Sequence, residues 1–339
     1  MKEESKILIT SPARLHLGFM DLNGSLGRKF GSVGLAIDSI ETSITVTKKS
    51  LKNDIAINDY NKRAYDYAKL ILQAYELDES VSIDVHKKIP EHAGLGSGTQ
   101  LALTTGVAIS KLFNLNLSLM DIGKILDRGN RSGIGIGAFE SGGFLIDGGK
   151  GNSAELPPII VRQDFPGNWR IILLINKREK GIHGQKEYNA FKTLKPFPVN
   201  LSEQLCRLVN MVILPSLIEK NFYDFSLAVG KLQKIVGTHF SPIQGGVYSN
   251  PDIANIMNFV EKKGFMGVGQ SSWGPTGFIL TDSDTAAHKL TKEIKQNFLC
   301  KDLQIEIISG RNKGSEITFV NKSEEISQNL NSNSNSNKT

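Results

Sequence analysis

The sequence has 339 residues, of which 40% are hydrophobic and 22% charged, and its formal net charge is +6. These values are typical of a globular chain with one large domain or two moderate ones. Residues 1–10 contain acidic side chains and no apolar run, and the apolar run at residues 170–176 is far too short to cross a bilayer. We therefore expect a cytoplasmic protein with no signal peptide and no membrane partner.

The surplus of positive charge favours an anionic ligand. Nucleic-acid-binding proteins usually cluster basic and aromatic residues on one face. Here the basic residues are interleaved with acidic ones, and only 7% of the residues are aromatic. A small anion is therefore the better prediction, and nucleic acid is not an expected partner. Cys206 and Cys300 lack the spacing of a metal site and are predicted to be buried thiols in a reducing compartment.

The first half of the chain is predicted to be rich in strands and then helical. Short runs of Ile, Val, Leu and Thr, separated by Gly, Pro and Asp, predict strands at residues 6–10, 13–19, 32–37, 41–49 and 80–89. Apolar residues at helical spacing predict helices at residues 61–77, 99–113 and 118–129. Ser118 and Asp121 are spaced as a capping box for the last of these helices.

A glycine-dense segment, residues 131–151, follows these helices. Glycine is costly in a helix, so this segment is predicted to be backbone that lies close to a ligand, or a tight turn that leads into a strand at residues 143–149. The prolines at positions 157, 158 and 166 indicate a domain boundary.

The second half is predicted to open with a strand at residues 169–176. Helices follow at residues 202–220, with a kink near Pro215, at 222–237 and at 251–264. Two strands, a helix and a further strand, at residues 265–270, 277–282, 283–298 and 303–309, predict an antiparallel sheet with helices on one face. The predicted fold class is therefore α+β. Residues 321–339 end in Asn and Ser without core-forming residues and are predicted to be a disordered tail.

A glycine-rich loop, Gly94-Leu95-Gly96-Ser97-Gly98, lies between a predicted strand and a predicted helix. A helix N-terminus offers free N–H groups and a partial positive charge, and glycines let an anion approach the backbone. The candidate phosphate or diphosphate ligands are therefore Gly94, Gly96, Ser97, Gly98 and Thr99; the alternative is a tight loop without a ligand. No lysine follows the last glycine, so this is not a Walker loop, and the spacing does not match a dinucleotide-binding fingerprint.

Three segments resemble, in order, the three motifs of the GHMP kinase superfamily: "SPARLHLGFMDLNG", "IPEHAGLGSGTQLALTTGVA" and "GVGQSSWGPTGFIL". The resemblance extends to about residue 320. It implies an N-terminal domain like the second domain of ribosomal protein S5, residues 1–165, and a ferredoxin-like C-terminal domain, residues 166–320. The ligand is expected in the cleft between these domains.

Two positions depart from the kinase pattern. Kinases of this superfamily usually carry an aspartate that acts on the hydroxyl to be phosphorylated, and a phosphate-loop serine that reaches the metal. Gly135 and Gly98 occupy the matching places. A positioned base contributes about 10²–10⁴-fold in rate, so its loss argues against simple phosphoryl transfer, although glycine leaves a substrate-assisted version open.

One branch of the superfamily, the β-ribofuranosylaminobenzene 5′-phosphate synthases of tetrahydromethanopterin synthesis, resembles this chain in six ordered segments. They are "RLHLGFMDLNG", "GLGSGTQLAL", "GIGAFESGGFLIDGG", "KGIHGQKE", "FSPIQGGVYSNP" and "GVGQSSWGPTGF". The resemblance implies condensation of phosphoribosyl diphosphate (PRPP) with 4-hydroxybenzoate or 4-aminobenzoate, with release of diphosphate and carbon dioxide. Departure of diphosphate needs stabilised negative charge but no protein base. No nucleotide is expected in this reaction, and the alternatives are an ATP-dependent small-molecule kinase or an inactive ligand-binding relative.

The resemblance also directs attention to polar residues in these segments. The candidate catalytic residues are Arg14, His16, Glu140 and His183, and Lys180 joins the glycine loop as a candidate phosphate ligand. The candidate substrate-binding residues are Asp21, Gln185, Gln244, Gln270, Ser271 and Ser272. His239 is a further candidate for the wall of the site.

Mg²⁺ is the expected cofactor, with Asp21 or Glu140 as its ligand. Several polar or aromatic residues in these segments also have a purely structural interpretation. Asp21 can form a turn, and Arg14 and His16 can be one face of a strand. Asp147 can be a buried structural carboxylate, and Trp273 can be a core residue. A homodimer is expected only because dimers are the most frequent oligomers.

Overall fold

The structure, a computed structural model, describes residues 5–49, 55–57, 62–152, 155–178, 181 and 192–320. Its larger sheet has seven strands in the order β11-β1-β2-β4-β3, and β5 pairs with β2 while β6 pairs with β5. These strands are β1 (Lys6–Asp21), β2 (Phe30–Lys49), β3 (Ile55–Ile57), β4 (Ser80–Lys87), β5 (Phe144–Asp147), β6 (Ile159–Gln163) and β11 (Glu316–Val320).

β1 and β2 are longer than predicted, because each joins two of the predicted strands into one. Register shifts between Pro12 and Ala13 and between His16 and Gly18 mark irregularities in the pairing of β1 with β2. A bulge accommodates a proline, which lacks a ladder N–H, and bends the strand without ending it. The residues that separate the predicted strands therefore interrupt the register but not the strand.

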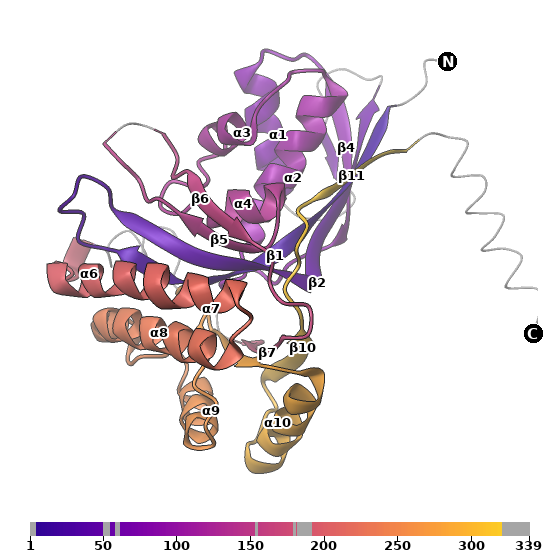
Figure 1. Cartoon of the computed structure of the whole chain (residues 1–339). Helices are drawn as coiled ribbons and strands as arrows, with labels where there is room; N and C mark the ends of the chain where they lie inside the picture. Colours follow the sequence, from indigo (N-terminus) through magenta and orange to yellow (C-terminus); the bar gives the residue numbers. More distant parts are fainter. Residues whose placement is uncertain are drawn as a thin grey trace, which may run out of the picture.

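Four helices cover one face of this sheet (Figure 1): α1 (Lys62–Ala74), α2 (Ser97–Leu112), α3 (Leu119–Ile125) and α4 (Ile134–Glu140). Their apolar side chains pack against Ile7, Ile9, Ile44 and Val46 of the sheet. The predicted capping box of α3 is confirmed, since Ser118 Oγ accepts from the amide of Asp121 and Asp121 Oδ2 accepts from the amide of Ser118, both at 3.1 Å.

The first part of the glycine-dense segment is a helix, so the prediction of a loop or turn is wrong there. A Cβ on Gly135 of α4 would lie 2.8 Å from Thr99 Cγ2 in α2, and a Cβ on Gly137 would lie 2.8 Å from Ile159 Cγ1 in β6. Glycine therefore lets α4 pack more closely than any other residue would. These tertiary contacts offset the local cost of glycine in a helix.

The second half contains a four-stranded antiparallel sheet of order β10-β7-β9-β8, as predicted. Its strands are β7 (Arg170–Asn176), β8 (Val268–Gln270), β9 (Thr276–Thr281) and β10 (Leu303–Ile308). The helical elements are α6 (Val199–Leu208), a π-helical turn η1 (Val209–Ile213), α7 (Leu214–Ile218), α8 (Phe222–Gln244), α9 (Pro251–Lys262) and α10 (Asp284–Asn297).

The second sheet is covered on both faces, whereas helices were expected on one face only. Ile172 and Leu174 of β7 pack with apolar residues of α9 and α10. Leu173 and Ile175, which point the other way, pack in the core that contains α8 and the first sheet. The continuous apolar run of β7 is the sign of a strand buried on both sides.

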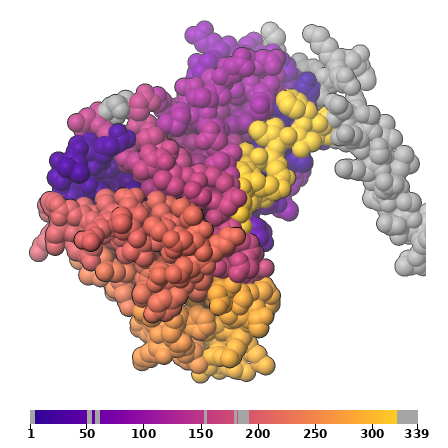
Figure 2. Space-filling view, viewed as in Figure 1, coloured from indigo at the N-terminus to yellow at the C-terminus, as the bar shows by residue number. Residues whose placement is uncertain are grey.

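The chain ends by returning to the first sheet. β11 pairs antiparallel with β1, with Lys6 opposite Val320 and Thr10 opposite Glu316. In Figure 2 the yellow residues of this strand lie against the first half of the molecule. Residues 316–320 therefore do not belong with the second sheet, although the predicted range 166–320 places them there. The predicted tail, residues 321–339, lies outside the described residues.

α6, η1 and α7 form one helical run, Val199–Ile218, that is long and apolar enough to cross a membrane by length and composition alone. Leu205, Val209, Ile213 and Leu217 recur every four residues along it and are buried in the core shared with α8. We interpret the run as an amphipathic core helix.

Asp147 at the end of β5 ties the first sheet to the start of α4. Its buried carboxylate accepts hydrogen bonds from the amides of Ser32 (3.1 Å), Gly133 (2.9 Å) and Gly149 (2.9 Å) and from the hydroxyls of Ser32 and Ser132. Burial raises the pKa of this carboxyl, while the hydrogen bonds oppose that shift. Its role is structural, as the sequence indicates.

Replacing Asp147 by Ala is expected to lower the free energy of unfolding by about 3 kcal/mol or more, because several buried donors lose their acceptor. Denaturant unfolding measures the change. Asp66→Ala, at an exposed position on α1, is the control and should stay within about 0.5 kcal/mol of the parent. Equal midpoints for the two variants would contradict this role of Asp147.

Candidate functional site

Three segments far apart in the sequence meet between the two sheets. The hydroxyl of Ser271 donates to the carbonyl of Gly94 at 2.7 Å and accepts from the amide of His16 at 3.0 Å. The amide of Arg14 donates to the carbonyl of Leu95 at 3.1 Å. Strand β1, the glycine loop and the segment after β8 therefore form one hydrogen-bonded unit.

The glycine loop and residues 271–274 approach each other at backbone distance. Gly94 has φ = +81°, and a Cβ there would overlap the carbonyl oxygen of Ser271. A Cβ on Gly274 would likewise overlap the backbone of Ala93. Gly94 was predicted as a phosphate ligand, and that role stays a prediction; the structure shows that glycine at this position lets the two halves of the protein pack together.

The N-terminus of α2 is arranged as the sequence predicts. Gly96 is its N-cap with φ = +87°, and no side chain caps the helix. The amide of Gln100 makes the first intrahelical hydrogen bond, to Gly96 O at 3.0 Å. The amides of Ser97, Gly98 and Thr99 precede that bond, so they are the groups that a helix N-terminus offers to an anion.

Two arginine side chains lie on either side of this helix N-terminus. Arg14 Nη1 donates to Gly94 O at 2.5 Å, and a Cβ on Gly96 would lie 3.4 Å from Arg14 Cζ. A Cβ on Gly98 would overlap the guanidinium of Arg63, which extends from α1. Positive side chains are unfavourable at the positive end of a helix dipole, and an anion bound there would relieve that repulsion.

Arg63 was not among the site residues predicted from the sequence. It lies in a regular amphipathic helix, where the sequence does not distinguish it from the other basic residues. Its guanidinium Nη1 lies 3.5 Å from Glu91 Oε1, and only the packing of α1 against α2 brings it over Gly98.

The position of the kinase aspartate is occupied by packed backbone. Gly135 contacts the side chain of Thr99, and Gln100 Nε2 donates to the carbonyl of Gly135 at 2.8 Å. Any side chain at position 135 would have to displace Thr99. The structure thus agrees with the sequence argument that a carboxylate is missing at this place.

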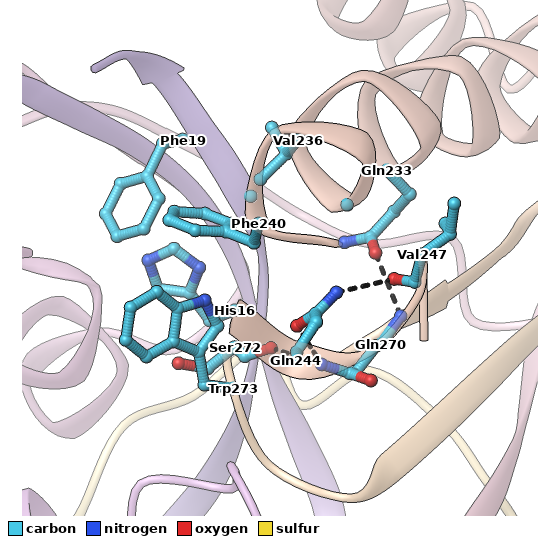
Figure 3. A pocket seen from close by; sticks show the side chains of 12 residues that line it. His16, Phe19, Gln233, Val236, Phe240, Gln244, Val247, Gln270, Ser272 and Trp273 are labelled. Atoms are coloured by element: carbon cyan, nitrogen blue, oxygen red, sulfur yellow. Dashed lines mark hydrogen bonds between the residues drawn. The ribbon is translucent and has the colours of Figure 1, made fainter. Parts of the chain in front are cut away.

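A pocket lies beside the glycine loop, between β1, α8 and the segment after β8 (Figure 3). It is lined by His16, Gly18, Phe19, Gln233, Val236, Gly237, Phe240, Gln244, Val247, Gln270, Ser272 and Trp273. The rings of His16 and Phe19 lie 4.6 Å apart and those of Phe240 and Trp273 lie 4.8 Å apart, between centroids. The pocket therefore has a largely aromatic wall.

His16 is a buried, titratable side chain in the wall of the pocket. It is only 4% exposed, and burial together with the nearby Arg14 lowers its pKa to about 3. The imidazole is therefore neutral at physiological pH. Its Nε2 atom has no hydrogen-bond partner among the described residues.

The glutamines around the pocket mainly hold backbone in place. Gln270 Oε1 accepts from the amide of Ser249 at 2.7 Å, and its Nε2 donates to Ser272 O at 3.0 Å. Gln244 Nε2 donates to Val247 O at 2.8 Å. The predicted substrate-binding residues Gln244, Gln270 and Ser272 thus line the pocket, while the Ser271 hydroxyl is committed to the glycine loop.

Other predicted residues lie elsewhere. Asp21 Oδ1 accepts from the amides of Asn23 (2.8 Å) and Gly24 (3.0 Å) and from Ser202 Oγ (2.8 Å), which matches its interpretation as a turn former. Glu140 is exposed at the end of α4, where the amide of Ser315 donates to Phe139 O. His239 does not line the pocket but packs on Phe197, with ring centroids 4.8 Å apart.

Neither Asp21 nor Glu140, the two alternative predictions for the Mg²⁺ ligand, belongs to a cluster of potential metal ligands among the described residues. No group of three or more His, Cys, Asp or Glu side chains within the described ranges is arranged to hold a metal ion. Mg²⁺ therefore stays a prediction without a protein site among these residues. Lys180, His183 and Gln185 lie outside the described residues.

The chain was compared with known proteins. Residues 60–143 match the family model of the GHMP kinases N terminal domain, and residues 213–299 match that of the GHMP kinases C terminal domain. The chain is 37% identical over 311 residues to the β-ribofuranosylphenol 5′-phosphate synthase of Methanocaldococcus jannaschii, covering 84% of this chain and 92% of that protein. The protein of the same name from Archaeoglobus fulgidus is 32% identical over 326 residues, covering 91% and 98%.

Solved structures show the same fold. Mevalonate diphosphate decarboxylase from Staphylococcus aureus aligns with a TM-score of 0.65 and 15% identity over 93% of this chain and 98% of its own. Homoserine kinase from Cytophaga hutchinsonii aligns with a TM-score of 0.62 and 16% identity over 94% and 98%. The predicted GHMP-kinase-like fold is thus confirmed, and the chain belongs to the β-ribofuranosylphenol 5′-phosphate synthase family of the GHMP kinase superfamily.

Proposed function

We propose that this protein is a glycosyltransferase that condenses PRPP with 4-hydroxybenzoate, forming β-ribofuranosylphenol 5′-phosphate, diphosphate and carbon dioxide. The observation that carries the proposal is the meeting of a cationic helix N-terminus with an aromatic pocket, next to a kinase position that has no carboxylate. The relatives are named as synthases of a phenol, which supports the hydroxy acid over the amino acid.

The donor half of the reaction needs a stabilised leaving group. As the bond from ribose C1 to diphosphate breaks, negative charge grows on the diphosphate. The amides of Ser97, Gly98 and Thr99 and the guanidinium groups of Arg14 and Arg63 provide positive charge in fixed positions. Glycine at position 98 makes room for the guanidinium of Arg63. A positively charged side chain of the protein therefore lies near the position of the metal-binding serine in the kinase pattern.

The acceptor half needs an aromatic ring beside ribose C1. The ring carbon that bears the carboxylate attacks C1, and loss of carbon dioxide then restores aromaticity. No protein group has to remove a proton from that carbon, so the missing carboxylate at Gly135 is no obstacle. The segment 271–274 lines the pocket with Ser272 and Trp273 and also packs against the glycine loop. The pocket therefore lies next to the proposed diphosphate site.

The alternative functions fit the site less well. A kinase would need a base for the acceptor hydroxyl, and the packing of Gly135 on Thr99 leaves no space for one at the usual place. An inactive relative would have no reason to keep two arginines at an uncapped helix N-terminus.

The proposal predicts diphosphate and carbon dioxide in equal amounts when the protein is incubated with Mg²⁺, PRPP and 4-hydroxybenzoate. Diphosphate is measured with a coupled assay and carbon dioxide with carboxyl-labelled substrate. A parallel incubation with ATP and candidate alcohols should show no ATP turnover. If neither 4-hydroxybenzoate nor 4-aminobenzoate led to diphosphate release, the proposal would be wrong, and ATP turnover would favour the kinase alternative.

Replacing Arg63 by Met should lower kcat/KM for PRPP by about 10²-fold or more, because removal of one oxyanion contact costs about 2.7–4 kcal/mol in the barrier. The KM for 4-hydroxybenzoate should change little. Arg207→Met, at an exposed arginine of α6, is the matched control and should keep the activity of the parent. Parent-like kcat/KM for PRPP in Arg63→Met would show that Arg63 does not contact the diphosphate.

A further inference from the structure

The pocket between β1 and α8 has the chemistry of a site for an aromatic ring. Four rings contribute to its wall, those of His16, Phe19, Phe240 and Trp273, and the valine side chains at positions 236 and 247 add apolar surface. Aromatic walls favour flat apolar ligands through edge-to-face and stacked contacts. In Figure 3 the rings of His16, Phe240 and Trp273 lie close together at one side of the pocket, and the glutamines lie at the other.

The size of the pocket sets a condition on any ligand. Its cavity volume is about 40 Å³, and the empty space reaches about 460 Å³ when the open solvent at its mouth is included. An apolar cavity of about 150 Å³ holds a benzene ring. A bound ring therefore needs more space than the cavity offers, and part of it has to lie in the open mouth.

The residues that line the pocket provide an imidazole acceptor for a hydroxyl group but no cation for a carboxylate. The residues that line it include no Lys, Arg, Asp or Glu. Both side-chain amide nitrogens of Gln244 and Gln270 already donate to protein oxygens. The buried Nε2 of His16 has no partner among the described residues, and it is an acceptor in the tautomer that carries the proton on Nδ1.

Resting on the proposed function, we propose that the pocket binds the ring of the acceptor acid with its para-hydroxyl donating to Nε2 of His16, and that His16 takes this proton during bond formation. The carboxylate then points out of the pocket, because no cation lines it. The reacting carbon lies at the carboxylate end of the ring, opposite the hydroxyl, so this orientation presents it to the ribose.

The proposed step releases diphosphate and carbon dioxide and returns the hydroxyl proton to the product. The bond between the ring carbon and ribose C1 forms while the bond from C1 to diphosphate breaks. The para O–H bond gives its proton to Nε2 of His16 and its electron pair to a C=O bond, which leaves a neutral dienone. The bond to the carboxylate then breaks, carbon dioxide leaves, its electron pair restores the aromatic ring, and the oxygen takes the proton back from His16.

The surroundings of His16 suit a temporary proton acceptor. Burial and the nearby Arg14 keep the imidazole neutral before the reaction. The same two features make the imidazolium unstable, so the proton returns when carbon dioxide leaves. The amide of His16 also holds Ser271 beside the glycine loop, which couples the position of the ring to that of the diphosphate.

A binding cycle tests the placement of the ring. The affinities of 4-hydroxybenzoate, 4-methoxybenzoate and benzoate are measured by calorimetry for the parent and for His16→Phe. The parent should bind 4-hydroxybenzoate at least tenfold more tightly than the other two acids, and the ratio should fall below threefold in the variant. An equal ratio in the two proteins would overturn the placement. If His16→Phe does not fold, the parent alone decides: equal affinities for 4-hydroxybenzoate and 4-methoxybenzoate would overturn the placement of the ring.

A pH profile tests the proton transfer. In His16→Phe, diphosphate release at neutral pH should fall by about 10²–10⁴-fold. The rate should then rise as the pH approaches about 10, where a phenol ionises and has no proton left to transfer. A deficit of the same size at pH 7 and at high pH would contradict the role of His16 as proton acceptor.

These measurements distinguish a wrong function from a wrong placement of the ring. If the parent releases no diphosphate, the proposed function is wrong whatever the binding cycle shows. If the parent turns over but the cycle shows no dependence on His16, the proposed function stands and the inference about the pocket is wrong.

Discussion

The close approach of the glycine loop and the segment 271–274 is the constraint on which the rest of the site depends. Side chains at positions 94 and 274 would overlap the facing backbone, so both positions have to be glycine. The hydroxyl of Ser271 then links the loop to β1 with one donated and one accepted hydrogen bond. Because this contact joins the two sheets, it sets the position of the α2 N-terminus relative to the aromatic pocket.

The charge at the site follows from the same packing. In the kinase pattern a serine and an aspartate would stand where this chain has Gly98 and Gly135. Here one glycine makes room for the guanidinium of Arg63, and the other lets α4 close onto Thr99. The result is a helix N-terminus with added positive charge and without a carboxylate at the kinase position, which suits the departure of an anion.

Sequence patterns predicted most of the elements, because local periodicity reflects burial. The strands β4 and β7, the helices α1 and α2 and the capping box at Ser118 follow this rule. The errors arose where packing overrides local preference. α4 is a helix in spite of its glycines, and β11 joins the first sheet although it follows the second in sequence. The roles of polar residues were predicted less well than the elements. Asp21 was predicted as a ligand but shapes a turn, and no sequence pattern indicated that Arg63 lies over Gly98.

The sequence by itself determined the family, the position of the glycine loop at the start of a helix, and the two glycines that separate this chain from the kinases. These features are local, and the residues that specify them are adjacent in the chain. The tertiary structure alone decided which side chains surround that loop. It placed Arg63 over Gly98, and it enclosed His16 among aromatic rings with Nε2 buried. Such placements depend on how α1, α8 and β1 pack across the fold, and spacing along one chain does not encode them.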